Sequence, residues 1–152
     1  MKIDYSEYEW NEGLCGKISI PNENFNKKIN VEIHEDDNAE VRDESKRLFE
    51  FFLDNYAKYK EIAIKEILDY YDSYRMNLGT IEPDDPDYPE ANDIDTISKM
   101  ISLKTIIIHN PDLYDKDAIG LIYDCTWDKD DGIGINLSGF DVVSIGTHDC
   151  AY

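Results

Sequence analysis

Histidine, cysteine and aspartate side chains gather in the second half of the chain, and these are the residue types of a cysteine-nucleophile site. They are His109, Cys125, His148, Asp149 and Cys150. Cys125 shares one face of a predicted strand with large apolar residues, so its thiol is expected to be buried and unreactive. Cys150 lies close to the chain end, where a nucleophile is poorly held in place. We therefore predict no catalytic residue in this group.

An acidic turn, residues 128–132 with the sequence Asp-Lys-Asp-Asp-Gly, has the composition of a cation site. An EF-hand loop requires acidic ligands at positions 1, 3 and 5, glycine at 6 and glutamate at 12. No alignment of this segment meets that spacing. Aspartate and glycine are also typical of tight turns, in which Gly132 is free to take a positive φ. We therefore predict a turn without a metal ion.

The glycines that follow do not have the pattern of a phosphate-binding loop. Gly132 and Gly134 are separated by one residue, but no Lys-Ser or Lys-Thr pair comes after them. The acidic surroundings also oppose the binding of an anion. We therefore expect no nucleotide cofactor, and no other cofactor is predicted.

Residues 80–92 are acidic and proline-rich, which is typical of an exposed loop. Between residues 82 and 95 the chain has seven acidic and no basic side chains. Such a segment is either a solvated loop or a contact surface that steers a basic protein toward it. The candidate contact residues in this loop and in the acidic turn are Glu82, Asp84, Asp85, Asp87, Asp128, Asp130 and Asp131.

The net charge of the chain limits the kinds of molecule that we expect it to bind. The 152 residues include 34 acidic and 15 basic side chains, a formal net charge of −19. Nucleic acids and anionic membranes are recognised by clustered lysine and arginine, so neither is expected as a partner. Hydrophobic residues make up 41% of the chain, enough to form the core of a folded domain.

Targeting signals and disulfide patterns are not recognisable in the sequence. The three cysteines include no Cys-x-x-Cys pair, which argues against a zinc site or a disulfide framework. The N-terminal segment lacks the apolar stretch of a secretory signal. No apolar run is longer than three residues, as at Ile106–Ile108, so no membrane span is expected. We predict one domain, residues 1–152, in the cytoplasm.

Alternation of apolar and polar residues predicts strands at both ends of the chain. Segments near 14–20 and 29–35 are separated by turn residues and are expected to form a hairpin. The later strands, expected to form an antiparallel meander with short connections, are 105–109, 119–127, 133–137 and 140–147.

Between these strands the apolar residues recur every three or four positions from Asp43 to Met76, as in an amphipathic helix. An unbroken helix of that length would measure about 50 Å, so we expect a break near 55–60. A short helix is expected at 93–103, capped by Asp93 or Asp95. This order predicts an α+β fold, in which a twisted antiparallel sheet carries the long or broken helix and the short helix on one face.

Five tyrosines lie in the predicted helical region: Tyr56, Tyr59, Tyr70, Tyr71 and Tyr74. Tyrosine combines a large apolar ring with a polar tip, so such a group either borders a core or forms a docking face. A docking face would indicate a structural or oligomerisation module, and a homo-oligomer is one form it would take.

The last third of the chain resembles a bacterial domain family of unknown function. The likeness rests on Cys-x-Trp-Asp at 125–128, Gly-x-Gly at 132–134 and a Val-x-x-Gly strand that ends at Gly146. That family usually has a histidine before the first of these glycines, and this chain has Lys-Asp-Asp at 129–131 instead. The residues interpreted as a structural motif are Cys125, Trp127, Gly132, Gly134 and Gly146. The resemblance implies an association with immunity proteins of polymorphic toxins.

Three functional hypotheses follow. The leading one is a non-enzymatic immunity protein that covers a basic surface of a cognate toxin, such as a nuclease. The second is an oligomerisation module that uses the tyrosine-rich helix. The third is a metal-dependent enzyme that uses the carboxylates, for which added Ca²⁺, Mg²⁺ or Zn²⁺ would raise the melting temperature.

Overall fold

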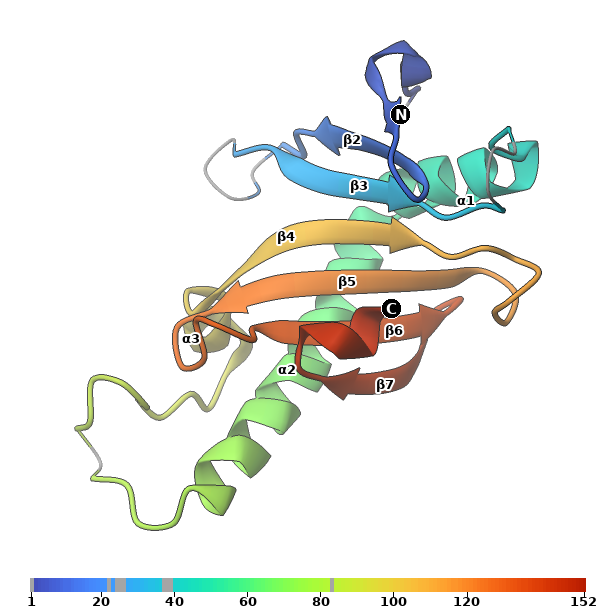
Figure 1. Ribbon diagram of the computed structural model, residues 1–152. Helices are drawn as coiled ribbons and strands as arrows, with labels where there is room; N and C mark the ends of the chain where they lie inside the picture. The colour runs from blue at the N-terminus through green and yellow to red at the C-terminus, as the bar shows by residue number, and fades with distance from the viewer. Residues whose placement is uncertain (1, 22, 24–26, 37–39, 83) are drawn as a thin grey trace.

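The computed structural model describes residues 2–21, 23, 27–36, 40–82 and 84–152. Within these residues the chain forms a seven-stranded sheet whose strands lie side by side in chain order (Figure 1). The strands are β1 Glu9–Trp10, β2 Leu14–Ile18, β3 Ile29–Ile33, β4 Ile101–Ile108, β5 Ala118–Cys125, β6 Ile133–Ser138 and β7 Asp141–Gly146. The helices are α1 Asp43–Asp54, α2 Tyr56–Asn77 and α3 Ile94–Ser98, with 3₁₀ turns η1 Tyr5–Glu7 and η3 His148–Ala151.

The predicted α+β class is confirmed, with one correction to the sheet. The hairpin of β2 and β3 and the meander of β4 to β7 are antiparallel, as expected. The β3–β4 pair is parallel, so the prediction of a wholly antiparallel sheet was wrong at its centre. All three helices lie in the connection between these two strands. A helical crossover of this kind returns the chain to the end of the sheet where β3 began, and β4 therefore runs in the same direction.

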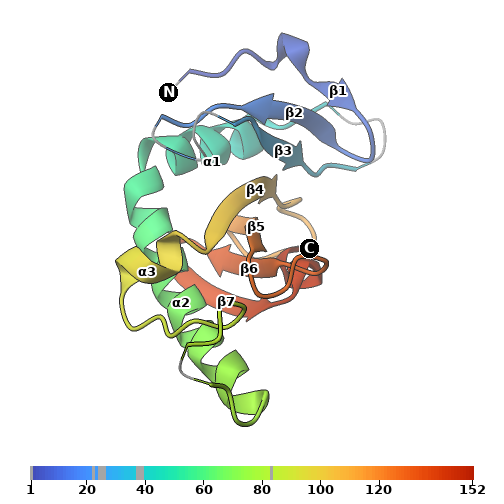
Figure 2. The ribbon, with the colours of Figure 1, turned by 90° about the vertical axis from the view of Figure 1, so that its left-hand side faces the viewer.

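The helices cover one face of the sheet (Figure 2). The predicted break in the long helical segment is confirmed at Asn55, which separates α1 from α2. Its φ and ψ of −112° and 21° leave the helical range, and its side-chain Nδ2 donates to the carbonyl oxygen of Phe51 at 2.9 Å. Asparagine competes in this way with the regular helical hydrogen bonds, which explains why the break occurs here.

The short helix ends earlier than the sequence predicts. Asp93 caps α3 by accepting a hydrogen bond of 2.7 Å from the Thr96 amide, but α3 extends only to Ser98. The chain is already in β4 at Ile101, which pairs with Cys125. Pairing with β5 therefore overrides the local helical pattern of residues 99–103.

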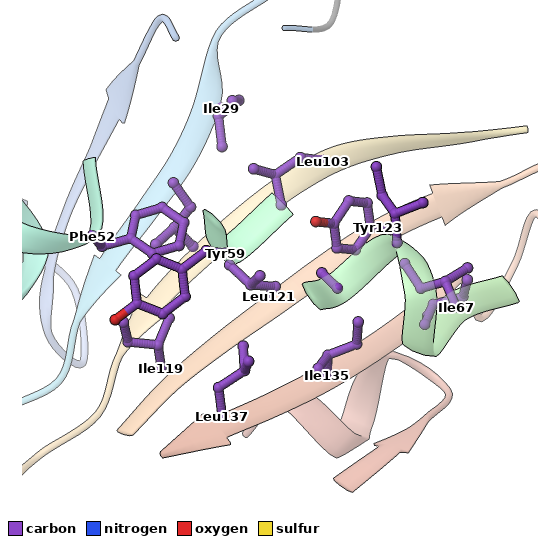
Figure 3. Close-up of a cluster of buried hydrophobic side chains, with 14 of the residues drawn as sticks. Ile29, Phe52, Tyr59, Ile67, Leu103, Ile119, Leu121, Tyr123, Ile135 and Leu137 are labelled. Carbon is purple, nitrogen blue, oxygen red and sulfur yellow. The ribbon is translucent and has the colours of Figure 1, made fainter. Parts of the chain in front are cut away.

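The main core lies between the helices and the sheet (Figure 3). Phe52 and Tyr59 from the helices pack with ring centroids 4.8 Å apart, in the same buried cluster as Leu121 and Ile135 of the sheet. These four side chains are at most 1% exposed. Complete burial of one such apolar side chain contributes about 1.5–3 kcal/mol to folding, so this layer is the principal stabilising element.

The opposite face of the sheet carries the last residues of the chain. Turn η3 packs on β5, β6 and β7, where glycines provide a surface without side chains. Gly134 and Gly146 are direct partners in the β6–β7 register. A Cβ on Gly134 would lie 2.5 Å from the Thr147 carbonyl oxygen, closer than real contacts allow. Tyr152 then reaches β3, where its hydroxyl donates to Glu32 at 2.9 Å.

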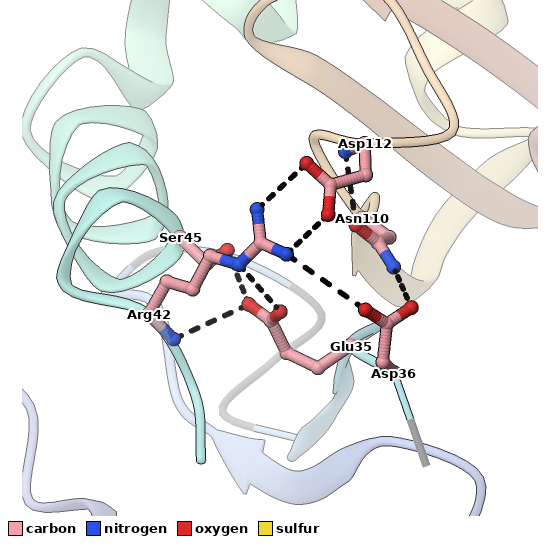
Figure 4. A network of polar contacts seen from close by, with 6 residues as sticks. All are labelled: Glu35, Asp36, Arg42, Ser45, Asn110 and Asp112. Atoms are coloured by element: carbon pink, nitrogen blue, oxygen red, sulfur yellow. Dashed lines mark hydrogen bonds and ion pairs between the residues drawn. The ribbon is translucent and has the colours of Figure 1, made fainter. Parts of the chain in front are cut away.

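A network of polar side chains joins β3, the start of α1 and the β4–β5 loop (Figure 4). The guanidinium of Arg42 lies 3.3 Å from the carboxylate of Glu35, whose side chain is fully buried. Arg42 also makes a bidentate contact with Asp112 in the β4–β5 loop. Asn110 completes the network by donating from Nδ2 to Asp36 at 3.1 Å. The first turn of α1 is thereby attached to both neighbouring strands.

Candidate functional site

The acidic loop predicted at 80–92 lies against the C-terminal half of α2. The hydroxyl of Tyr71 donates to the carbonyl oxygen of Pro89 at 2.6 Å, and Arg75 donates from Nε to the carbonyl oxygen of Tyr88 at 3.1 Å. The rings of Tyr74 and Tyr88 stack with centroids 6.4 Å apart. The loop is therefore attached to the helix by its backbone, while Glu82, Asp84 and Asp87 are exposed and Asp85 accepts a hydrogen bond from the Asp87 amide.

The acidic turn is held by hydrogen bonds from its backbone amides to Asp128. Asp128 accepts from the Gly132 amide through its carbonyl oxygen at 3.0 Å and from the Asp131 amide through Oδ1 at 3.1 Å. Gly132 has φ +60°, and a Cβ there would lie 2.5 Å from the Tyr123 carbonyl oxygen. Only glycine satisfies both requirements, so the geometry of the turn depends on this residue.

Tyr71 brings the acidic loop and the acidic turn to the same end of the molecule. Its ring packs on Trp127, next to the turn, with centroids 4.4 Å apart, while its hydroxyl contacts the loop at Pro89. Figures 1 and 2 show the loop, α3 and the β5–β6 connection at this end. We call this surface the acidic end and define it by the carboxylates Glu82, Asp84, Asp85, Asp87, Asp128, Asp130 and Asp131 and the rings of Tyr74 and Tyr88.

The acidic end has little internal charge compensation. Within the described part of the chain, none of its seven carboxylates forms an ion pair with a lysine or arginine. The pKa of Tyr74 is raised, first by burial and then by Tyr88 and by the charges of Asp128 and Asp131. The Tyr74 ring therefore lies close to both the acidic turn and the loop residue Tyr88.

Two apolar side chains extend from the end of α2 beside the acidic loop. Met76 is 80% exposed and Leu78 is 46% exposed. Apolar and acidic side chains are therefore both exposed in this part of the chain.

The five tyrosines of the predicted helical region differ in how deeply they are buried. Tyr59 and Tyr71 are fully buried in the core, and Tyr56, Tyr70 and Tyr74 are half-buried at its edge. The five side chains therefore do not form one exposed face on the helices. Sequence analysis missed Tyr88, which joins Tyr74 in the candidate site. The signal that could have identified Tyr88 was its position in the loop, among prolines and acidic residues.

The histidines and cysteines do not converge on a nucleophile. Burial lowers the pKa of His109 to about 4 and raises the pKa of the Cys125 thiol to about 11, so both are neutral near pH 7. His148 and Cys150 lie on η3, on the other face of the sheet from the core that contains Cys125. Among the described residues, no three histidine, cysteine or acidic side chains are arranged to hold a metal ion.

Comparison with known families gives one result. The sequence profile of a domain of unknown function, DUF6985, matches residues 2–152. The chain belongs to the DUF6985 family. Searches of curated proteins and of solved structures found no match. In the described part of this DUF6985 chain, no helix is both long and apolar enough to cross a membrane.

The residues that carried the likeness in sequence have distinct places in this DUF6985 domain. Cys125 and Trp127 are buried in the main core. Gly132 forms the bend of the acidic turn, and Gly134 and Gly146 lie under η3. Each position meets a packing or backbone requirement of the fold.

Proposed function

We propose that this DUF6985 protein is a non-enzymatic immunity protein that covers a basic surface of a cognate bacterial toxin with its acidic end. The observation that supports this proposal is that two acidic segments about 40 residues apart in the chain lie on one surface, where no carboxylate of the acidic end is ion-paired with a lysine or arginine among the described residues. A nuclease is a suitable toxin, because an enzyme that binds phosphates has a basic active site.

The likeness in residues 125–146 supports the immunity role, and the charge supports the kind of partner. A net charge of −19 accelerates encounter with a basic protein by electrostatic steering. The loop is also attached to α2 before binding, so less conformational entropy is lost when the complex forms.

The test measures association of the protein with the product of the neighbouring gene, which the proposal takes as the toxin. Replacement of Asp84, Asp85 and Asp87 by lysine should lower the association rate at least about tenfold at low salt and weaken its salt dependence. The matched control replaces Glu9, Asp115 and Asp141, three exposed acids outside the acidic end, with the same change in charge. Equal rates for the two triple variants would remove the acidic end from the interface.

Co-expression provides the functional readout. Cells that produce the toxin should grow when the wild-type protein or the control triple variant is co-expressed. They should grow poorly with the variant changed at Asp84, Asp85 and Asp87. Failure of the wild-type protein to protect cells from the neighbouring gene product would contradict the immunity role itself.

A further inference from the structure

A half-open pocket of about 200 Å³ lies on the face of the sheet opposite the helices. Thr105 and Ile122 of the two central strands form its floor. Residues of the acidic turn and His148 and Tyr152 of the C-terminal segment also line it. The strands and the C-terminal turn that carry these residues face the viewer in Figure 1. Pockets for drug-sized ligands occupy about 300–1,000 Å³, so this one has room for a single side chain.

The pocket is negatively charged. Asp124, Asp130 and Asp131 contribute three carboxylates against the one ammonium group of Lys104. Lys104 lies 3.9 Å from Asp124, and both side chains are more than half exposed. An exposed pair at this distance is weak, so Lys104 does not prevent a second cation from binding to Asp124. Asp130 and Asp131 have no cationic partner among the described residues.

The wall of the pocket is held in place before any ligand binds. The carbonyl oxygen of Asp131 accepts hydrogen bonds from the backbone amide and from Nδ1 of His148, at 3.0 and 2.9 Å. The other ring nitrogen of His148 lies 3.0 Å from Asp149. Both ring nitrogens thus have partners in the protein, which hold the ring in place where it lines the pocket. A preformed wall lowers the entropic cost of binding.

We infer that this pocket receives one arginine side chain of a basic partner, and this inference rests on the proposed function for the basic character of that partner. Carboxylates among the lining residues match the donors of a guanidinium group, and the aromatic side chains of His148 and Tyr152 also line the pocket. A metal ion is a poorer occupant, because the carboxylates do not converge on one point. Asp130 and Asp131 also belong to the acidic end, so the pocket provides an anchor within that interface.

The test titrates two blocked tripeptides, acetyl-Gly-Arg-Gly-amide and its citrulline analogue, into the ¹⁵N-labelled protein and follows amide chemical shifts. Citrulline has nearly the same shape as arginine but no charge. The arginine peptide should shift the amides of Thr105, Ile122 and Gly132 in a saturable manner, and the citrulline peptide should bind at least about fivefold more weakly. Equal binding of the two peptides, or shifts elsewhere in the protein, would overturn the inference.

Two triple variants with the same change in charge assign the binding to the pocket. Asp124→Asn, Asp130→Asn and Asp131→Asn together should weaken binding of the arginine peptide at least about fivefold, whereas Glu82→Gln, Asp84→Asn and Asp87→Asn together should change it less than about twofold. The same amide spectra report whether each variant is folded. Equal weakening by both triple variants would indicate a general charge effect and overturn the inference.

A third titration separates this inference from the proposed function. A deca-lysine peptide should bind the wild-type protein through the whole acidic end and lose affinity in both triple variants. Binding of deca-lysine without selective binding of the arginine peptide contradicts only the pocket. Binding of the arginine peptide in the pocket without any binding of deca-lysine contradicts the proposed docking of a basic surface.

Discussion

Ser45 in the first turn of α1 donates a hydrogen bond of 2.8 Å from Oγ to Oε1 of Glu35, the residue two positions beyond the end of β3. The same oxygen accepts from the backbone amide of Arg42 at 3.3 Å. Helix α1 has no capping hydrogen bond from its own N-cap side chain. A carboxylate from outside the helix therefore accepts from one backbone amide and one hydroxyl at this end and is favoured there by the helix dipole.

The hydrogen bonds and ion pair of Glu35 predict that a small change in its side chain lowers the stability of the protein. Glu35→Gln keeps the size of the side chain but removes the charge that faces Arg42, and should lower the free energy of unfolding by about 2 kcal/mol. Urea denaturation measures the difference. Glu40→Gln, an exposed glutamate near the same helix, is the control and should change stability by less than about 0.5 kcal/mol. Equal stability of the two variants would show that the network does not hold α1.

The buried histidine predicts a dependence of stability on pH. The pKa of His109 is lowered to about 4 in the folded protein, chiefly because the ring is buried. The unfolded chain, with a histidine pKa near 6.5, binds the proton more readily between these values. Folding is therefore favoured above about pH 6.5, and about 3 kcal/mol of stability is lost as the pH falls toward 4.

The variant His109→Phe isolates this effect from the titration of the many carboxylates. Its ring can keep the stacked contact that His109 makes with Tyr114, at a centroid distance of 4.0 Å. Denaturation at a series of pH values should show a smaller loss of stability between pH 6.5 and 4 for the variant than for the wild-type protein. Parallel pH profiles would mean that His109 is protonated in the folded state as easily as in the unfolded chain.

Because η3 packs closely on the glycines of the sheet, we predict that a side chain added at one of them destabilises the protein. In Gly134→Ala the new Cβ would lie 2.5 Å from the Thr147 carbonyl oxygen and 2.6 Å from that of His148, so η3 must move away from the sheet. We expect a loss of about 2 kcal/mol in urea denaturation and faster amide exchange in residues 147–152. Gly139→Ala serves for comparison, because φ is +59° there but no atom lies within 4 Å of the new Cβ.

Gly139→Ala should cost only the backbone strain of about 1 kcal/mol and leave the exchange of residues 147–152 unchanged. A C-terminal segment that exchanges at the same rate in both variants would contradict the packing of η3 on Gly134.

Because the Tyr71 hydroxyl attaches the acidic loop to α2, we predict that its removal increases the mobility of the loop. Tyr71→Phe removes the hydrogen bond to the Pro89 carbonyl oxygen but keeps the ring against Trp127. Loss of about 1 kcal/mol from this contact should speed amide exchange in residues 84–91 about fivefold. Tyr70→Phe, whose hydroxyl forms no hydrogen bond with described residues, should leave the exchange of the loop unaltered.

Local patterns were sufficient to predict most of the elements. The alternation of Ile29, Val31 and Ile33 predicted β3, and the spacing of apolar residues predicted both long helices and the break between them. Local patterns failed at residues 99–103, where pairing of Ile101 with Cys125 extends β4 into a segment with helical character. A hydrogen bond to a strand 20 or more residues away leaves no local signature, so this boundary could not be predicted.

The sequence by itself determined the α+β class and the acidic character of the protein, and it predicted candidate residues for contact with a basic partner. Each of these depends on composition or on the spacing of neighbouring side chains. The tertiary structure decided that β3 and β4 run parallel, that Tyr71 brings the loop at 82–87 and the turn at 128–131 to one end, and that Asp124 and His148 border one pocket. These relationships join residues far apart in the chain, and they form only because burial of the core selects one arrangement of the elements.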